Sequence, residues 1–168
     1  MIGVFLMNNI LVRNNVKILG EGDRTIIFAH GFGCDQNMWR YITPFFEKNY
    51  QIILFDHVGS GNSDLTAYDF EKYSTLHGYA QDVLDILETL KLKNVIFIGH
   101  SVSSMIGMLA SIERPEYFSK MIMIGPSPCY INEGDIYHGG FEEKDVLELL
   151  TMMEMNYFSW ASFMAPLG

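Results

Sequence analysis

The sequence predicts an α/β fold in which a mostly parallel central sheet is flanked by helices. Two observations lead to this prediction. Short apolar runs rich in β-branched residues, at 25–29, 51–56 and 95–98, are typical of strands buried on both faces of a parallel sheet. Segments with helical spacing, above all 76–90, separate these runs. Strands that alternate with helices in this way are typical of βαβ units.

Composition limits what the chain can do. With 168 residues, of which 49% are hydrophobic, it has the size of one domain with a substantial core. A formal net charge of −9, with the acidic residues scattered, argues against nucleic acid or an anionic membrane as a partner, because binding phosphate groups requires clustered Lys and Arg. No run is long enough to span a membrane.

Targeting signals and cysteines indicate a cytoplasmic protein. The apolar stretch at 1–6 lacks the basic start and the small-residue cleavage site of a signal peptide, and Met7 is an alternative start. Two cysteines far apart in the sequence, Cys34 and Cys129, indicate reduced thiols, which we expect to be buried and inert.

The first half of the chain alternates strands with helices. In chain order the expected elements are a hairpin at 10–19, a strand at 25–29, a helix at 38–46, a strand at 51–56 and a helix at 76–90. Asn14-Asn15 suits a two-residue hairpin turn, because Asn tolerates positive φ. Pro44 limits the regularity of the helix around it. The loop His30-Gly31-Phe32-Gly33 follows a strand's carboxyl end, where open α/β sheets bind ligands.

The second half changes character near residue 141. The expected elements are a strand at 95–98, a helix at 105–112, a strand at 120–124, and helices without strands from Phe141 onward. The helix at 105–112 is apolar nearly all round, so we expect it in the interior, ended by Pro115. The helices after residue 141 have the pattern of a lid and not of a sheet layer.

The run from Val95 to Met108 predicts a strand, a sharp turn and a helix. Ser101 occupies the tip of this turn, whose strained backbone holds the side chain clear of the sheet. Small residues must flank such a tip, and Gly99 is one, but Ser103 stands where the usual pattern has a second glycine. We predict that Ser101 is a nucleophile; the alternative is a serine that only caps the helix.

A nucleophilic serine needs N–H groups that stabilise an oxyanion. The residue after the nucleophile, Val102, is expected to donate one, and Phe32 in the earlier loop is expected to donate the second. The alternative is that the glycines of that loop only make a turn. His100 adjoins Ser101, but neighbouring side chains at a tight turn point apart, so we expect it to shape the turn.

The remaining polar residues do not indicate a metal or a cofactor. None of the five histidines pairs at ligand spacing with another His or Cys. Gly59-Ser60-Gly61 begins like a dinucleotide-binding loop, but Asp64 stands where the last glycine of that pattern would be. His30 and His57 lie at strand ends, and we expect them to structure loops.

Taken together, these motifs resemble the α/β-hydrolase family. Its motifs occur in order at His30 to Gly33, at Asp56 to Asp64 and at Gly99 to Ser101. Longer segments are similar to the RsbQ-type bacterial stress-response hydrolases and to the plant karrikin and strigolactone receptors, namely 31–36, 54–61, 78–83, 99–102 and 125–130. The resemblance extends from about Asn9 to the last residue.

The resemblance implies the α/β-hydrolase fold, a small apolar pocket beneath a helical lid, and Ser101 as nucleophile. It implies hydrolysis of an ester or a similar acyl bond in a small apolar molecule. For the RsbQ type it also implies activation of a stress sigma factor through a PAS-containing phosphatase. The alternative is a ligand-sensing signalling protein that binds such a partner, with hydrolysis incidental or absent. Carbon–carbon bond cleavage and perhydrolysis use the same motifs and stay open.

In the α/β-hydrolases the catalytic acid and histidine follow the serine, on loops after later strands. We expect both beyond Gly168, so the chain would contain a partial core at 8–130 and the start of a lid at 131–168. His138 is the only histidine after Ser101, and it matches no catalytic position of the family. The strand at 120–124 would then have an unpaired edge, and we expect the isolated polypeptide to aggregate.

Overall fold

The computed structural model of the protein describes residues 10–165 and divides them into two units. The first unit ends at Pro126 and the second begins at Ser127. The boundary expected from the sequence fell slightly later, after Tyr130. The possible start at Met7 lies outside the described residues.

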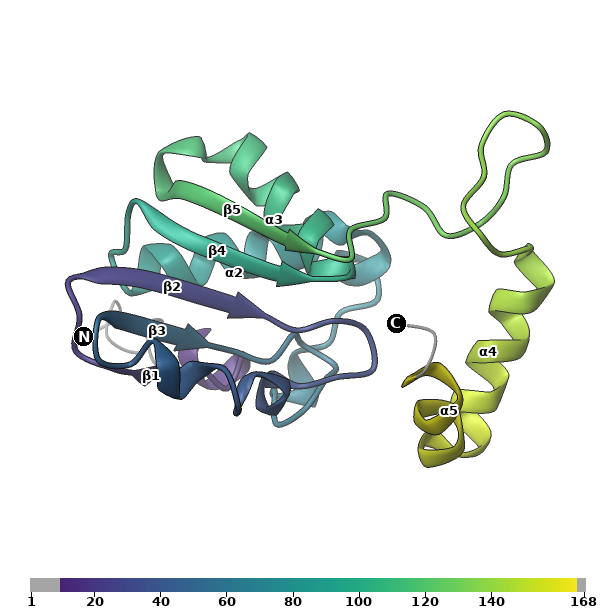
Figure 1. Ribbon diagram of the computed structural model, residues 1–168, viewed down its shortest axis with the longest axis horizontal. Coiled ribbons are helices and arrows are strands. Elements are labelled where there is room, and N and C mark those ends of the chain that lie inside the picture. The colour runs from purple at the N-terminus through teal and green to yellow at the C-terminus, as the bar shows by residue number, and fades with distance from the viewer. Residues whose placement is uncertain (1–9, 166–168) are drawn as a thin grey trace. The chain divides into compact units, whose positions relative to one another are not determined.

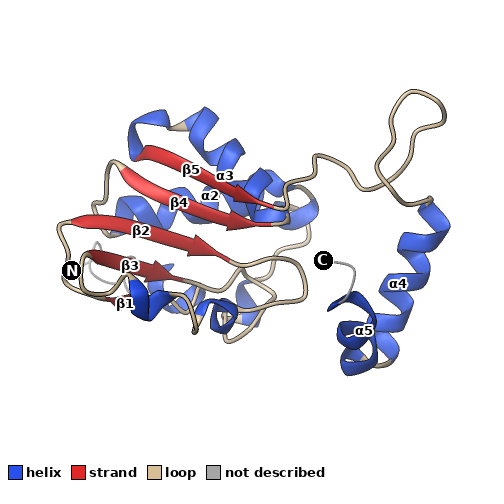
Figure 2. Cartoon of the chain, in the orientation of Figure 1, coloured by secondary structure: helices blue, strands red, loops and turns tan. Residues whose placement is uncertain are grey.

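A five-stranded sheet forms the centre of the first unit (Figures 1 and 2). In chain order its strands are β1 (Lys17–Leu19), β2 (Arg24–Ala29), β3 (Tyr50–Leu54), β4 (Val95–His100) and β5 (Phe118–Ile124). They lie in the order β1-β3-β2-β4-β5; β1 is antiparallel to β3 and all other pairs are parallel. The predicted mostly parallel sheet is confirmed, and the loops after the parallel strands gather at one edge.

Two helices cover one face of the sheet and pack on one of its two cores. α2 (Leu76–Thr89) and α3 (Val102–Glu113) lie behind the strands in Figure 1. The core under them includes Ile27, Ile53, Phe97, Val83, Leu87 and Ile106. The alternate residues of the same strands form the second core, which includes Ile26, Phe28, Ile52, Ile96 and Trp39. Strands that bury both faces read as continuous apolar runs, which explains why the sequence pattern located them.

The second face is covered by short 3-10 helices, not by the α-helix expected at 38–46. The observed elements are η1 (Gln36–Trp39) and η2 (Thr43–Phe45). Pro44 lies in the first turn of η2, and its missing N–H prevents a helix from continuing through it. Trp39 still reaches the core, where its ring lies 5.0 Å from that of Phe28.

The hairpin expected at 10–19 is wrong. Residues 10–13 are helical, and the Asn14 N–H donates to the Ile10 carbonyl at 3.1 Å. Asn15 has φ 44°, so the asparagine pair ends a helix instead of joining two strands. The strand after it, β1, pairs with β3.

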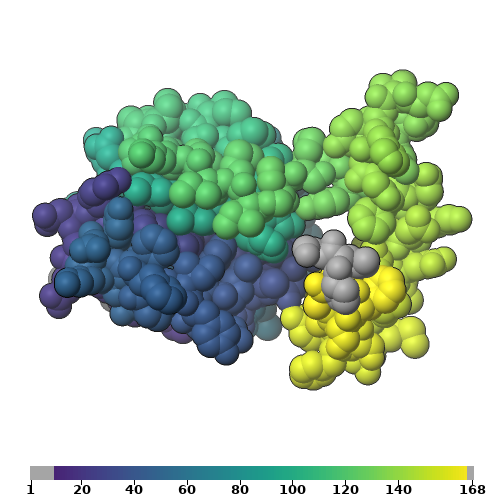
Figure 3. Space-filling view, viewed as in Figure 1, coloured from purple at the N-terminus to yellow at the C-terminus, as the bar shows by residue number. Residues whose placement is uncertain are grey.

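β5 lies at an edge of the sheet, as expected for the strand at 120–124, whereas part of α3 is more exposed than its apolar sequence indicated. Ile122, Met123 and Ile124 on β5 are 46%, 37% and 41% exposed, and the green atoms around this strand are open at the surface in Figure 3. On α3, Met108 is 37% and Ile112 is 70% exposed, so the expectation of a wholly interior helix is wrong.

The second unit consists of a folded loop and two helices. The loop carries isolated bridges between Ile131 and Phe141 and between Glu133 and Tyr137. α4 (Glu143–Met155) begins with a capping box from Glu142 and Asp145, and α5 (Tyr157–Met164) follows. The helices predicted after residue 141 are confirmed, and their role as a lid stays a prediction. None of the helices within residues 10–165 is long and apolar enough to cross a membrane.

Candidate active site

The predicted strand, turn and helix around Ser101 are present. β4 ends at His100 and α3 begins at Val102, and between them Ser101 has φ 54° and ψ −123°. A residue with a side chain pays about 1–3 kcal/mol for such a backbone, so the surrounding structure must hold it there. The Ser101 N–H donates to the carbonyl of Ile124 at 2.8 Å, and the Ser101 carbonyl accepts from the N–H of Ser104 at 2.9 Å.

Glycine at position 99 lets α3 pass close to the end of β4. A Cβ on Gly99 would lie 2.5 Å from the carbonyl oxygen of Ser103 and 2.8 Å from the nitrogen of Ser104, closer than atoms can approach. The flanking position that departs from the usual pattern, Ser103, is fully buried. Its backbone makes this contact, while its hydroxyl donates to the carbonyl of His30.

The loop after β2 packs directly against the Ser101 turn. A Cβ on Gly31 would lie 2.5 Å from Nδ1 of His100 and 3.3 Å from Cβ of Ser101, so a larger residue would require the His100 ring to move. The ring of His100 therefore fills the space beside this loop, while burial lowers its pKa. The next residue, Phe32, has a side chain that is 58% exposed.

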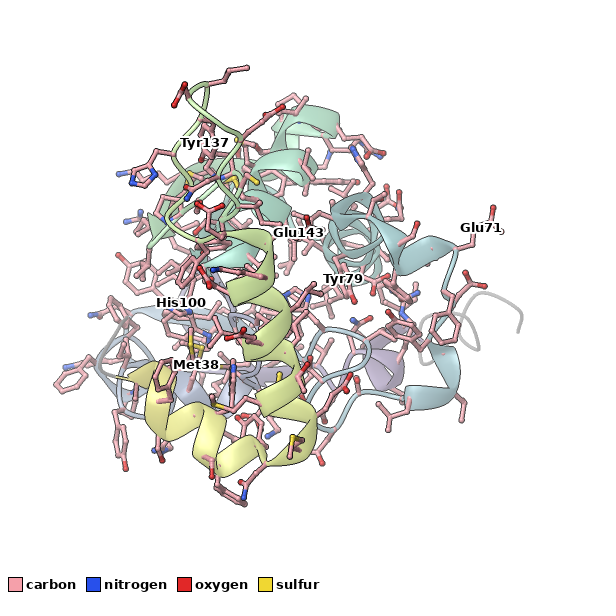
Figure 4. The ribbon with its side chains drawn as sticks, turned by 90° about the vertical axis from the view of Figure 1, so that its right-hand side faces the viewer. Met38, Glu71, Tyr79, His100, Tyr137 and Glu143 are labelled. Carbon is pink, nitrogen blue, oxygen red and sulfur yellow. The ribbon has the colours of Figure 1, made fainter. Side chains whose placement is uncertain are left out.

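Phe32 and Val102, the two residues predicted to stabilise an oxyanion, border the same small cavity. The cavity has a volume of about 170 Å³ and is lined by His30, Gly31, Phe32, His57, Ser60, Leu76, Tyr79, Val102 and Ile106. Val102 is the first residue of α3, where a helix leaves its N–H groups without an intrahelical acceptor. Figure 4 views this end of the sheet, with His100 and Tyr79 labelled. A cavity of this size suits a small group and not a whole drug-sized ligand.

A buried carboxylate holds the loops around the site, and sequence reasoning missed it. Oδ1 of Asp56 accepts from the Gln36 N–H at 2.8 Å, and Oδ2 accepts from Nδ2 of Asn15 at 2.7 Å and from the Asn62 N–H at 3.0 Å. Burial alone would raise the pKa of Asp56, but these hydrogen bonds outweigh burial and hold the pKa below its usual value. An aspartate placed directly after a buried strand was the signal in the sequence.

Two histidines of the cavity wall, His30 and His57, are buried and hydrogen-bonded. His30 is completely buried and His57 is 5% exposed. Burial lowers the pKa of His30, and burial together with the neighbouring His30 lowers the pKa of His57 to about 3. In the second unit, Nδ1 of His138 lies 2.9 Å from Oδ1 of Asn132.

Neither a metal site nor a disulfide is found among residues 10–165. No group of three or more His, Cys, Asp or Glu side chains in this part of the chain is placed to hold a metal ion. Both thiols are unpaired. Cys34 is half-buried, which raises its pKa, whereas Cys129 is exposed, so the expectation that both are buried is wrong.

Comparison with proteins of known sequence gives relatives with nearly half of their aligned residues identical. A strigolactone esterase from Arabidopsis thaliana is 48% identical over 161 residues, which cover 96% of this chain and 60% of that protein. A karrikin insensitive 2 receptor from Petunia hybrida is 47% identical over 154 residues, which cover 92% of this chain and 57% of that protein. The chain therefore spans less than two thirds of the length of these relatives.

Solved structures agree with this relationship. A hydrolase from Oleispira antarctica is 50% identical and superposes with a TM-score of 0.87, covering 96% of this chain and 59% of that one. An esterase from Exiguobacterium antarcticum, at 24% identity and a TM-score of 0.74, shares the fold. The model of the alpha/beta hydrolase fold family matches residues 24–148. Since that match includes β2, the Ser101 turn and the sheet between them, the chain belongs to the alpha/beta hydrolase fold family.

Proposed function

We propose that this chain carries the nucleophile and the oxyanion hole of a serine hydrolase that cleaves an ester or a similar acyl bond in a small apolar molecule. The observation that carries the proposal is the backbone of Ser101, which has φ 54° at a strand-to-helix turn with the Gly31 loop packed against it. A capping serine has no need of this conformation, because a helix N-cap normally adopts the β region.

The proposed reaction is a two-step acyl transfer. Oγ of Ser101 forms a bond to the acyl carbon and passes its proton to a general base, while the N–H groups of Val102 and Phe32 stabilise the oxyanion. The bond from carbon to the leaving oxygen then breaks, and the base returns the proton to the departing alcohol. Water hydrolyses the acyl-serine by the same steps and releases the acid.

The general base and the catalytic acid are proposed to lie in a part of the hydrolase fold that the relatives contain and that these 168 residues do not cover. His57 is unsuited to the role, because burial lowers its pKa to about 3 and leaves it a weak base, and both ring nitrogens of His30 are engaged with backbone groups. An apolar substrate is supported by the cavity wall, to which Leu76, Val102 and Ile106 contribute. It agrees with the relatives that are named strigolactone esterases.

A fluorophosphonate probe tests the nucleophile. The protein expressed from its complete reading frame is treated with the probe and the labelled peptide is identified by mass spectrometry. We expect Ser101 to be labelled and Ser101→Ala to lose labelling by at least about 10³-fold. Ser111→Ala is the matched control, because this serine on the same helix donates only to the carbonyl of Met108 and should leave labelling unchanged. An unlabelled Ser101 in the wild-type protein would remove the nucleophile.

The finer role suggested by the sequence is also a proposal. The RsbQ-type segments support a link to a stress sigma factor through a PAS-containing phosphatase, and the two unpaired cysteines support a cytoplasmic location. Co-purification of the protein with such a phosphatase would test the partner.

A second candidate function is ligand sensing, which is favoured by the relatives named as receptors at 46% to 47% identity. In that case the cavity binds a small molecule and hydrolysis is incidental. Ser101→Ala separates the two candidates: signalling that persists without the hydroxyl supports sensing, and loss of both signalling and hydrolysis supports catalysis as the trigger.

A further inference from the structure

We propose that Ser103 and His57 are positioning residues that act through His30 to fix the backbone of the 30–33 loop beside Ser101. The three side chains form a buried hydrogen-bonded relay between the ends of β2 and β3 and the start of α3. The proposal rests on the proposed function, since it assigns the relay to the loop that carries Phe32.

The donor of each bond follows from the chemistry of its partner. Oγ of Ser103 lies 2.5 Å from the carbonyl oxygen of His30, and a carbonyl can only accept, so the hydroxyl proton points to His30. The same Oγ lies 2.7 Å from Nε2 of His57. Because the hydroxyl proton is already used, Ser103 must accept this second bond and His57 must carry its proton on Nε2.

His30 is fixed by the same argument. The backbone N–H of His57 donates to Nε2 of His30 at 3.1 Å, so this nitrogen carries no proton. Nδ1 of His30 lies 2.9 Å from the carbonyl oxygen of Gly31, which can only accept, so Nδ1 carries the proton. The two imidazoles therefore have opposite tautomers, and each is determined by a backbone group or by a hydroxyl that bonds a backbone group.

The surroundings keep both rings neutral. His30 and His57 lie edge to face, with centroids 4.7 Å apart, and the rings of Phe55 and Tyr79 lie 5.1 Å and 5.5 Å from that of His57. The carboxylates of Asp56 and Asp35 act on His30, and that of Asp56 acts on His57, but burial outweighs both and lowers the two pKa values. The relay is therefore intact at neutral pH.

The relay explains the departure of this sequence from the usual turn. Glycine at position 103 would leave the His30 carbonyl and Nε2 of His57 without the hydroxyl that joins them. Ser103 lies two residues after Ser101 on α3, and its bond to His30 reaches the residue just before Gly31, which packs on Ser101. The side chain at 103 thus links the nucleophile's own helix to the oxyanion loop.

The tautomers are tested without any activity, by long-range ¹⁵N–¹³C correlation spectra of the histidine rings in the full-length protein. We expect the Nε2–H form for His57 and the Nδ1–H form for His30. Ser103→Ala should shift the ring nitrogen signals of His57. Ser104→Ala is the matched control, because this buried neighbour donates to the Gly99 carbonyl at 2.7 Å and not to the relay. The relay is overturned if His57 of the wild-type protein is in the Nδ1–H form, or if Ser103→Ala leaves the ring nitrogen signals of His57 unchanged.

The positioning role is tested by the rate of Ser101 phosphonylation. We expect His57→Phe and Ser103→Ala to lower the maximal inactivation rate about 10- to 100-fold with little change in probe affinity, because small misplacement of a reacting group costs this much. His57→Gln, whose amide can donate to Oγ of Ser103, should recover most of the rate. If all three variants react at the wild-type rate, or if all three lose the rate equally, the positioning role is contradicted. A wild-type protein that does not react overturns the nucleophile itself, while the tautomers still decide the relay.

Discussion

Two carboxylates of the first unit, Asp56 and Asp82, are both completely buried, yet their charges are compensated in different ways. Asp56 accepts only from neutral donors, two backbone N–H groups and one amide side chain. Asp82 lies 3.0 Å from the guanidinium of Arg13 and 2.6 Å from Nζ of Lys72. It also accepts from the phenol of Tyr73 at 2.9 Å.

The two kinds of partner correspond to two structural roles of the carboxylates. The backbone donors of Asp56 belong to the segments that follow β2 and β3, whose residues also line the cavity, so its bonds hold the backbone of these segments. The charged partners of Asp82 are long cationic side chains, and they join the N-terminal segment, through Arg13, and residue Lys72 to α2. Asn14 connects the two regions, since its Nδ2 lies 3.2 Å from the Asp56 carbonyl and 3.4 Å from Oδ2 of Asp82. Neutral donors suit a carboxylate that shapes loops, and cations suit one that joins elements.

The largest effect is expected from removal of the ionic partner. Asp82→Ala would leave two cations without their buried carboxylate, and we expect the free energy of unfolding to fall by about 3 kcal/mol. Urea denaturation followed by circular dichroism measures it. The control is Asp85→Ala, which removes a partly exposed pair with Arg13 at 3.1 Å and should cost less than about 1 kcal/mol. Similar losses in the two variants would mean that burial does not distinguish these pairs.

A smaller loss is expected at the other carboxylate. Asp56→Asn keeps the shape but places an NH₂ group among donors, so at least one buried donor loses its acceptor, at a cost of about 2 kcal/mol. The same denaturation experiment measures the loss. Asp64→Asn, at an exposed aspartate that accepts from the Thr66 N–H, is the control and should change the midpoint little. If Asp56→Asn is as stable as the wild type, neutral donors do not hold this region.

Acid should destabilise the protein through the Asp56 region, because the buried His57 next to Asp56 has a lowered pKa. The folded protein keeps the pKa of His57 near 3, while the unfolded chain has the ordinary value of 6.5. Below pH 6.5 the unfolded state therefore binds a proton that the folded state does not bind. The free energy of unfolding then falls by up to about 1.4 kcal/mol for each pH unit of acidification. Unfolding curves at pH 7.5, 6.5 and 5.5 measure the slope, which should be shallower in His57→Gln. Equal slopes in the two proteins would contradict a neutral His57.

The smallest effect is expected at an exposed ion pair, which gives the comparison a reference. Nε of Arg114 lies 2.7 Å from Oε1 of Glu116, and both side chains are about as exposed as they are buried. Glu116→Gln removes the charge and keeps the shape, and we expect no measurable change in the denaturation midpoint. A clear loss that disappears in 1 M salt would show that surface charges contribute to stability here.

Sequence reasoning succeeded where the signal is local. The apolar runs of β2, β3 and β4, the spacing of α2 and the turn at Ser101 each depend on neighbours within a few residues. It failed at the asparagine pair, because the partner of Asn14 that sets its role, Asp56, lies 42 residues away. It also failed around Pro44, where the residue that argues against a regular helix was visible in the sequence.

The candidate site divides in the same way. Ser101, Val102 and Phe32 could be named from motifs, whereas Asp56 and the Ser103 relay depend on contacts between distant segments, such as the one between His57 and Ser103, 46 residues apart. A serine at the position where glycine is usual was the one sign of the relay in the sequence.

The amide of Ser101 is held by the carbonyl oxygen of Ile124, at the end of the exposed edge strand. Every amino acid carries that oxygen, so the contact does not depend on which residue stands at position 124. Evolution can exchange the side chain there while the atom that matters keeps its place. A mutational scan would score position 124 as tolerant, and it would overlook one of the supports of the Ser101 turn.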